Sequence, residues 1–365
     1  VEPKAVDDAI AQVLTRQTAE GDFGLWRAEG GDRWLTAYVT DFLGRARAAG
    51  HAVPEASFKA ALRALQNGLN AAADPQNADP DENAATAYAA YVLAREGQAV
   101  VSDLRYYADT GGEGFATPLA AAQMGAALAA VGDQPRADRM FRQAQALADA
   151  GREPEALFRA DYGTILRDRA GVLALAAEAG SQAVDRAALS AGIAEGADKA
   201  ALSTQEAGWL VLAAQALSAG GDAGGGLTLS GAALSAPVVD LGDAAALPPV
   251  ALANGGAAPV RVVIGATAVP VDPPRAGGTA FKIARHYFTE AGLPVDPAQV
   301  ALGTRLVAVL EVLPLGPADG RLLIADPLPA GFEIDNPNLL TSGETGDLAW
   351  LGETGTADMT EFRQD

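Results

Sequence analysis

The sequence has 365 residues, a length that predicts two or three domains rather than one core. Hydrophobic residues make up 49% of it, enough to bury a sizeable interior, and a net charge of −20 argues against nucleic acid or an anionic membrane surface as a partner. The absence of cysteine excludes a disulfide, a thiolate zinc site and a cysteine nucleophile within these residues. No cofactor, metal site or membrane-spanning helix is predicted.

The N-terminal part is predicted to be helical and is organised around residues 21–46. A first helix is expected over residues 4–17. The stretch Gly21-Asp-Phe-Gly-Leu-Trp26 then predicts a turn that packs Phe23 and Trp26 against a neighbour. After it comes a buried helix with apolar side chains at intervals of three and four, namely Trp34, Leu35, Tyr38, Phe42 and Ala46.

Similar helices follow along the chain. They are expected over residues 54–69, 85–97, 119–131, 135–150, 162–179, 183–195 and 206–219. Thr117-Pro118 has the order of a cap followed by a first-turn proline, and Ser203-Thr-Gln-Glu206 has the spacing of a capping box. Apolar helices alternate with amphipathic ones, so the pattern predicts stacked helical hairpins with an inner and an outer ring, an α/α toroid over residues 1–221.

The composition changes at the glycine-rich segment 220–226, beyond which valine and proline replace the helical periodicity. Strands are expected over residues 227–229, 260–265, 281–288, 306–314, 321–326 and 348–351. Their spacing is typical of antiparallel β-sandwich domains. We therefore divide this part into a β segment over residues 222–278 and a C-terminal β-sandwich over residues 279–365.

Several stretches, in the same order along the chain, resemble the bacterial branch of the alpha-2-macroglobulin and complement family. They are Gly21–Trp26, Trp34–Leu43, Ser203–Ala213, Arg285–Phe288, Gly303–Leu310 and Asp326–Pro337. The resemblance implies a piece of a large periplasmic or secreted protein that can be anchored through an absent N-terminal part. In that family, a protease cuts a bait region, and a reactive thioester then captures the protease. Target proteases are therefore the implied partners of the whole protein. Residues 1–221 would be an N-terminally incomplete thioester-type domain, and 222–278 the returning part of a β-domain.

The sequence departs from the family at the thioester itself. The family forms this bond between a cysteine and a glutamine of a Cys-x-x-Gln motif, upstream of the helix that here begins near Pro3, and this sequence has no cysteine. Either the motif lies outside this sequence or the whole protein lacks it. We expect no catalytic activity from these residues alone.

Five residues are candidates for shielding the reactive bond or for contacting other parts of the protein. The aromatic candidates are Trp26, Trp34 and Tyr38, whose spacing is equally typical of ordinary core residues. Asp41 is either a carboxylate near a reactive site or the partner of an arginine on the next helix. Glu206 either contacts absent helices or caps its own helix, and capping is the preferred interpretation.

Two other functions remain open. The first is a thioester-less scaffold that binds an envelope protein such as a cell-wall synthesis enzyme. The second, less favoured, is a toroid enzyme of the terpenoid-cyclase or glycosidase type, which needs facing carboxylates or a metal cluster on the inner helices. Only Asp41 and Glu206 are candidates for such a pair.

Overall fold

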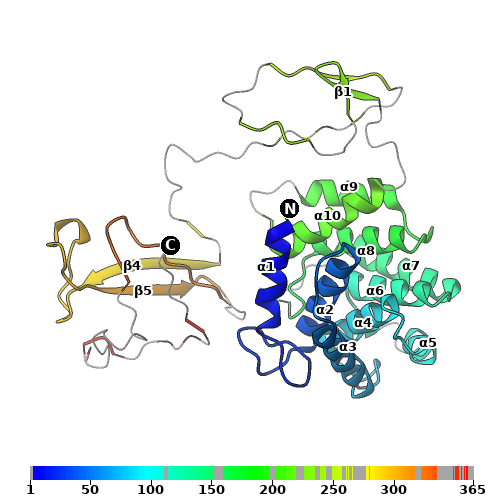
Figure 1. The fold of residues 1–365 in the computed structure, drawn as a ribbon, viewed down its shortest axis with the longest axis horizontal. Helices are drawn as coiled ribbons and strands as arrows, with labels where there is room; N and C mark the ends of the chain where they lie inside the picture. Colours follow the sequence, from blue (N-terminus) through cyan, green and yellow to red (C-terminus); the bar gives the residue numbers. More distant parts are fainter. Residues whose placement is uncertain are drawn as a thin grey trace. The chain divides into compact units, whose positions relative to one another are not determined.

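The computed structural model describes residues 3–110, 114–151, 159–197 and 202–218 of the helical part, then residues 226–234, 239–243, 249–256, 277–278, 280–316 and 322–334, and isolated positions between 260 and 360. The chain divides into two compact units, residues 1–154 with 159–268 and residues 155–158 with 269–365. All of the described α-helices belong to the first unit, where Figure 1 draws them in blue to green.

The described helices are α1 (Pro3–Leu14), α2 (Arg33–Ala48), α3 (Glu55–Asn70), α4 (Pro80–Arg95), α5 (Val101–Thr110), α6 (Pro118–Ala130), α7 (Gln134–Ala150), α8 (Ile165–Glu178), α9 (Arg186–Gly196) and α10 (Thr204–Ser218). Every predicted helix is present. Helix α5 is not among the predicted helices, because its 10 residues bury only Leu104, Tyr107 and Ala108, too short an apolar stripe to establish a helical period.

The helices form two layers, as predicted. The inner layer is α2, α4, α6, α8 and α10, each packed against the next, while α3, α7 and α9 pack on its outside. The central inner helices α4, α6 and α8 are buried on almost every side because they consist largely of alanine, leucine and valine. Alanine side chains let the inner helices approach closely.

The inner helices run in the same direction. Arg33 near the start of α2 pairs with Glu82 near the start of α4 at 3.2 Å, and Arg45 near the end of α2 lies 3.5 Å from Glu178 at the end of α8. Because an outer helix returns the chain between successive inner helices, α6 and α10 share this direction. The starting ends of the inner helices therefore gather at one end of the bundle.

Each inner helix begins at a side-chain cap. Asp32, Asp79, Thr117, Thr164 and Ser203 each accept a hydrogen bond from a backbone N–H three residues further on, at 2.8–3.2 Å. These bonds satisfy donors that a helix cannot satisfy internally. The capping predicted at Thr117 and Ser203 is confirmed, and all five caps lie at the starting end of the bundle.

The Gly21–Trp26 turn closes a small second core between α1, α2 and α3. Phe23 is buried there beside Leu43 and Phe58. Gly21 has a φ of +99°, and any Cβ at this position would overlap the backbone of Ala60, so both conformation and space require glycine. The predicted packing of Trp26 is wrong in part, since 38% of that residue stays exposed.

The β part contains two small antiparallel sheets among the described residues. Strands β1 (Leu227–Leu229), β2 (Ala232–Ala233) and β3 (Leu252–Asn254) form one, in the order β2-β1-β3. Strands β4 (Phe281–Phe288) and β5 (Val307–Pro314) form the other, with Phe281 opposite Pro314. The strands predicted at 227–229, 281–288 and 306–314 are thus confirmed.

The other predicted strands are not confirmed. Residues 322–326 carry no strand, because their Leu-Leu-Ile run remains largely exposed without a pairing partner. Trp350 and Leu351 lie in a turn or bend rather than in a strand. Half of the predicted strand 260–265 falls outside the described residues, and the three positions that the structure describes, 260, 262 and 265, carry no strand.

Candidate functional site

The predicted aromatic residues of α2 form one cluster with two further tyrosines. The ring of Trp34 stacks on Tyr38, with centroids 5.4 Å apart and planes 10° from parallel. It also packs edge-on against Tyr88 of α4, with centroids 5.8 Å apart, and at a tilt of 47° against Tyr162, just before α8, with centroids 5.3 Å apart. Trp34 is buried and Tyr38 is 37% exposed, so Tyr38 is the outward member of the cluster.

The environment of Tyr38 keeps its hydroxyl protonated. Burial of part of the ring raises the pKa of Tyr38, a hydrogen bond with Gln205 of α10 opposes that shift, and the charge of Asp41 reinforces it. The cluster therefore connects α2 with both α4 and α10. Trp26 shares no ring contact with Trp34, Tyr38, Tyr88 or Tyr162 among the described residues.

Asp41 is the centre of a second, ionic cluster. Of the two alternatives for Asp41, pairing with an arginine is the one that the structure contains, although Arg95 belongs to α4, the next inner helix, and not to α3, which follows α2 in the chain. Its carboxylate accepts hydrogen bonds from Arg95 of α4, from Nε of Arg45 at 3.1 Å and from the hydroxyl of Tyr88 at 3.0 Å. Arg45 also donates from Nη2 to the hydroxyl of Tyr91 at 2.9 Å. Every oxygen of Asp41 is thus occupied by a donor.

The pKa of Tyr91 predicts how the stability of this region changes at alkaline pH. Burial, together with the charge of Asp41, raises the pKa of Tyr91 from 10.0 to about 12. Below pH 10 both states hold the proton, and between pH 10 and about 12 only the folded protein holds it. Stability contributed by Tyr91 is therefore lost as pH rises through this window, by about 3 kcal/mol in total.

We expect Tyr91→Phe to flatten this alkaline loss, because phenylalanine has no proton to release. Urea unfolding at pH 9.5, 10.5 and 11.5 measures the slope for both proteins. The slope is the quantity to compare, since the variant also loses the bond from Arg45 at every pH. Equal slopes would contradict the prediction.

Glu206 performs the capping role that its spacing predicts. Its Oε2 accepts from the backbone N–H of Ser203 at 2.8 Å, while its own N–H donates to Oγ of Ser203 at 3.2 Å. Its Oε1 accepts from the hydroxyl of Thr164 at 2.7 Å, which ties the start of α10 to the start of α8. Glu206 is 1% exposed, so this capping box is part of the interior.

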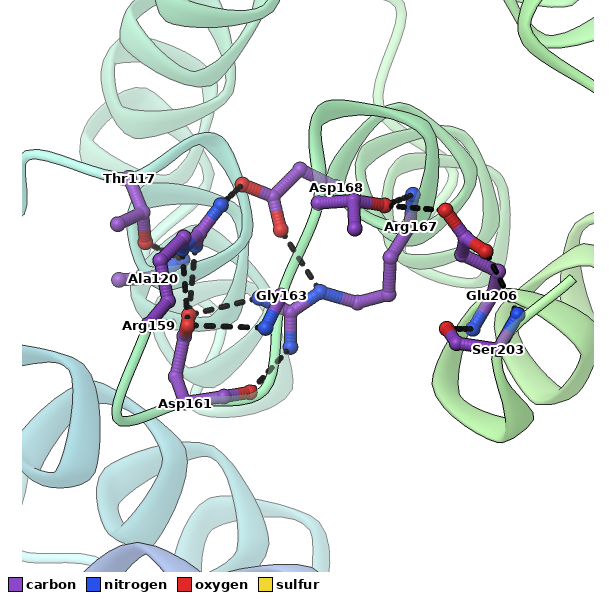
Figure 2. Close-up of polar contacts among 10 residues, drawn as sticks. Thr117, Ala120, Arg159, Asp161, Gly163, Arg167, Asp168, Ser203 and Glu206 are labelled. Atoms are coloured by element: carbon purple, nitrogen blue, oxygen red, sulfur yellow. Dashed lines mark hydrogen bonds and ion pairs between the residues drawn. The ribbon is translucent and has the colours of Figure 1, made fainter. Parts of the chain in front are cut away.

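A four-residue ion cluster that was not predicted lies beside this capping box. It is formed by Arg159, Asp161, Arg167 and Asp168 (Figure 2). Arg159 donates to Asp161 at 2.6 and 2.9 Å and to Asp168 at 2.9 Å. Arg167 donates to Asp161 at 2.7 Å and to Asp168 at 2.8 Å. Arg167 and Asp168 are fully buried, and the cluster has no net charge.

The two arginines keep Asp161 ionised in the interior. Burial by itself would raise the pKa of Asp161, but the charges of Arg167 and Arg159 outweigh it and hold that pKa below its ordinary value. The signal was present in the sequence as opposite charges at spacings of two, six and one along residues 159–168. Four charged residues at the start of an apolar helix normally indicate a solvated turn, which is why the cluster was missed.

Gly163 lies directly against this cluster and leaves no room for a side chain. A Cβ at this position would overlap Nη2 of Arg167 and lie 2.8 Å from Cζ of Arg159. We expect Gly163→Ala to lower the free energy of unfolding by about 1–3 kcal/mol, because the arginines must shift away from their carboxylates. Gly208→Ala on α10 is the control, since nothing lies within 4 Å of its Cβ position. Equal midpoints of urea unfolding for the two variants would contradict this expectation.

The described residues offer little else that suggests chemistry. No group of three or more histidine, aspartate and glutamate side chains among them is arranged to hold a metal ion. A cavity of about 340 Å³ lies between α2, α3 and α4, but its one cation, Arg33, already pairs with Glu82. No described helix is long and apolar enough to cross a bilayer.

Comparison with known proteins gives a consistent result. The family model described as bacterial alpha-2-macroglobulin MG10 domain matches residues 281–365. The alpha-2-macroglobulin of Escherichia coli K12 is 29% identical over 379 residues, covering 99% of this chain and 23% of that protein. The chain spans less than a quarter of the length of the curated relatives it matches.

Two solved structures share the fold. Salmonella alpha-2-macroglobulin reacted with methylamine gives a TM-score of 0.67 at 27% identity, covering 86% of this chain and 21% of that one. Escherichia coli alpha-2-macroglobulin activated by porcine elastase gives 0.51 at 25% identity, covering 86% and 28%. The MG10 match, the alignment along 99% of the chain and the shared helical fold agree with one another, and all three indicate the bacterial alpha-2-macroglobulin family.

Proposed function

We propose that this chain is part of a broad-spectrum protease inhibitor that traps proteases after they cleave a bait region. The observation that carries the proposal is the alignment of 99% of the chain with an alpha-2-macroglobulin. One matched relative has been reacted with methylamine and another activated by elastase. Methylamine is a small nucleophile, so reaction with it is what an electrophilic acyl bond such as a thioester predicts. We propose a periplasmic or secreted location on the same ground.

In this proposal, residues 1–221 are the thioester-type helical domain, 222–278 return to a β-domain and 279–365 form the C-terminal β-sandwich. The candidate shielding or interface residues are Trp26, Trp34, Tyr38, Asp41 and Glu206. The role of the helical domain is mechanical rather than catalytic: it holds aromatic side chains over the bond until cleavage of the bait.

The exposed apolar surface supports an incomplete toroid, although not at the place expected. An N-terminally incomplete domain would expose apolar surface near residues 1–20, but there the large apolar side chains that the structure describes are at least partly buried against α2 and α3. It lies instead on α10, which packs on α8 and leaves Val211 66% and Leu217 45% exposed. We propose that helices from elsewhere in a longer protein cover α10 and complete the toroid.

An enzyme of the toroid type finds no support in the inner carboxylates. Asp41 is bound by arginines near the finishing end of α4, whereas Glu206 is bound at the starting end of α10. The two acids are therefore held by different sets of partners, and each is already neutralised or hydrogen-bonded. A scaffold without a thioester remains the alternative, and it differs from the trap only in residues beyond this chain.

The test uses the longer protein that contains this chain. It is mixed with a trace of a broad-specificity protease, with and without methylamine pretreatment, and run on a denaturing gel beside the same protease blocked at its active site. We expect an inhibitor–protease band that survives denaturation and is absent after methylamine or with the blocked protease. Cleavage of the protein without any such band would overturn the thioester trap and favour the scaffold.

A further inference from the structure

The backbone of Tyr162 adopts a conformation that large side chains rarely take. Its φ is 53°, in the left-handed region, where a Cβ crowds the chain. Such a residue costs free energy and persists only when its surroundings determine it. Glycine would adopt the same φ without cost, and a glycine, Gly163, follows immediately. An aromatic ring at this position therefore calls for a cause.

The buried ion cluster fixes the chain on both sides of Tyr162, as Figure 2 shows for the labelled residues. Oδ1 of Asp161 accepts from the backbone N–H of Gly163 at 3.1 Å, and Nη1 of Arg167 donates to the carbonyl oxygen of Asp161 at 3.0 Å. The N–H of Tyr162 itself donates to the carbonyl oxygen of Arg159 at 2.9 Å. The peptide groups around Tyr162 are thus held by the same side chains that form the ion pairs.

The fixed backbone places the Tyr162 ring on Trp34 of α2, with centroids 5.3 Å apart. Trp34 in turn stacks on Tyr38, the outward ring of the cluster. A row of three rings therefore leads from the buried ion cluster to the surface of α2. Displacing Tyr162 removes the support on one side of Trp34.

Stability alone does not account for the cluster. Burying four charges costs desolvation energy, and apolar side chains of similar volume often stabilise a core equally well or better. Apolar contacts have no preferred direction, whereas forked arginine–carboxylate bonds fix both distance and orientation. The cluster thus supplies geometry that an apolar core would not.

We propose that the Arg159–Asp161–Arg167–Asp168 cluster is a positioning device that holds Tyr162 in its left-handed conformation and thereby fixes the Trp34–Tyr38 ring pair. If the Trp34–Tyr38 ring pair shields the thioester from small nucleophiles, Tyr162 is a further positioning residue for this shield. This last step rests on the proposed function, while the positioning itself does not.

The positioning is tested on the 365-residue chain labelled with 5-fluorotryptophan, which gives one fluorine resonance for each of its four tryptophans. Two variants are compared with wild type, Tyr162→Gly and the apolar combination R159M/D161L/R167M/D168L. We expect the Trp34 resonance to shift or broaden in both, while that of Trp350 in the second unit stays in place. A Trp34 resonance unchanged in Tyr162→Gly would overturn the proposal.

A third variant covers the case in which the fourfold replacement does not fold. Arg159→Lys keeps the charge and loses the forked bonds to Asp161 and Asp168, so a positioning role predicts a moved Trp34 resonance in a folded protein. A folded Arg159→Lys variant with the wild-type Trp34 resonance would overturn the role of the cluster. A folded R159M/D161L/R167M/D168L variant with the wild-type Trp34 resonance would likewise overturn the role of the cluster.

The link to the shield is tested in the longer protein by the rate at which methylamine inactivates trapping. We expect Tyr162→Gly to react several-fold faster than wild type, and Tyr106→Ala on α5 to react at the wild-type rate. If the wild-type protein forms no adduct at all, the proposed function fails while the fluorine result still decides the positioning. If wild type traps and Tyr162→Gly reacts no faster, the shielding role of Tyr162 is wrong and the proposed function stands.

Discussion

Arg167→Met is expected to lower the free energy of unfolding by about 3–5 kcal/mol, the largest loss that we predict for a single substitution in this chain. Arg167 is fully buried and donates to Asp161 and to Asp168. Methionine fills much of the volume but leaves two buried carboxylates sharing one guanidinium, that of Arg159. The uncompensated charge, rather than lost packing, is the source of the effect.

Urea unfolding followed by far-ultraviolet circular dichroism at pH 7 measures this loss, because the helices of the first unit dominate that signal. Arg142→Met on α7 is the matched control, since Arg142 is exposed. We expect the control to remain within about 0.5 kcal/mol of wild type. A loss below about 1 kcal/mol in Arg167→Met would contradict the prediction. It would show that water reaches the cluster and solvates the carboxylates that lose their partner.

Asp41→Asn is expected to produce the second largest effect, a loss of about 2–4 kcal/mol. The substitution keeps the shape of the side chain and removes its charge, so Arg45 and Arg95 face each other without an anion between them. The loss is smaller than at Arg167 because the two arginine side chains are 29% and 25% exposed and can recover part of their hydration.

The same unfolding experiment tests Asp41→Asn, with Asp8→Asn on the exposed face of α1 as its control. Moderate salt provides a second measurement. A partly exposed ion cluster weakens as ions screen it, so the difference between wild type and Asp41→Asn should shrink between 0.05 and 0.5 M NaCl, as the Debye length falls below about 10 Å. If the free energies of unfolding of wild type and Asp41→Asn differ little at low salt, Asp41 contributes little to holding α2 against α4.

The helical part could be predicted because its local signals agree with one another. Apolar spacing, caps and terminal glycines marked the inner helices, and Ser203 with Glu206 announced a capping box that the structure contains. Contacts across the bundle were less predictable: an arginine partner for Asp41 was one of two alternatives, and the partner, Arg95, lies on α4 rather than on the helix that follows α2. The ionic cluster at residues 159–168 could not be predicted, because nothing in the pattern of these residues shows that the surrounding helices bury them.

The predicted strands that the structure does not contain have a related explanation. Phe281–Phe288 and Val307–Pro314 pair with each other along their whole length, so the β-rich sequence finds its partner. Residues 322–326 are just as apolar, but a strand exists only where a neighbour accepts its hydrogen bonds. A sequence pattern shows the propensity of a segment to form a strand. It does not show whether another strand lies beside it to pair with.

The common direction of the inner helices has an electrostatic consequence. Each helix carries a partial positive charge at its start and a partial negative charge at its finish, and parallel neighbours add these charges instead of cancelling them. Asp161, Asp168 and Glu206 lie at the positive end, while Arg45 and Arg95 lie at the negative end. Arg159 and Arg167 neutralise Asp161 and Asp168, so Glu206 is the member of this group that adds net negative charge at the positive end. Reversing the charge at position 206 would therefore set it against the aligned dipoles that Glu206 now complements.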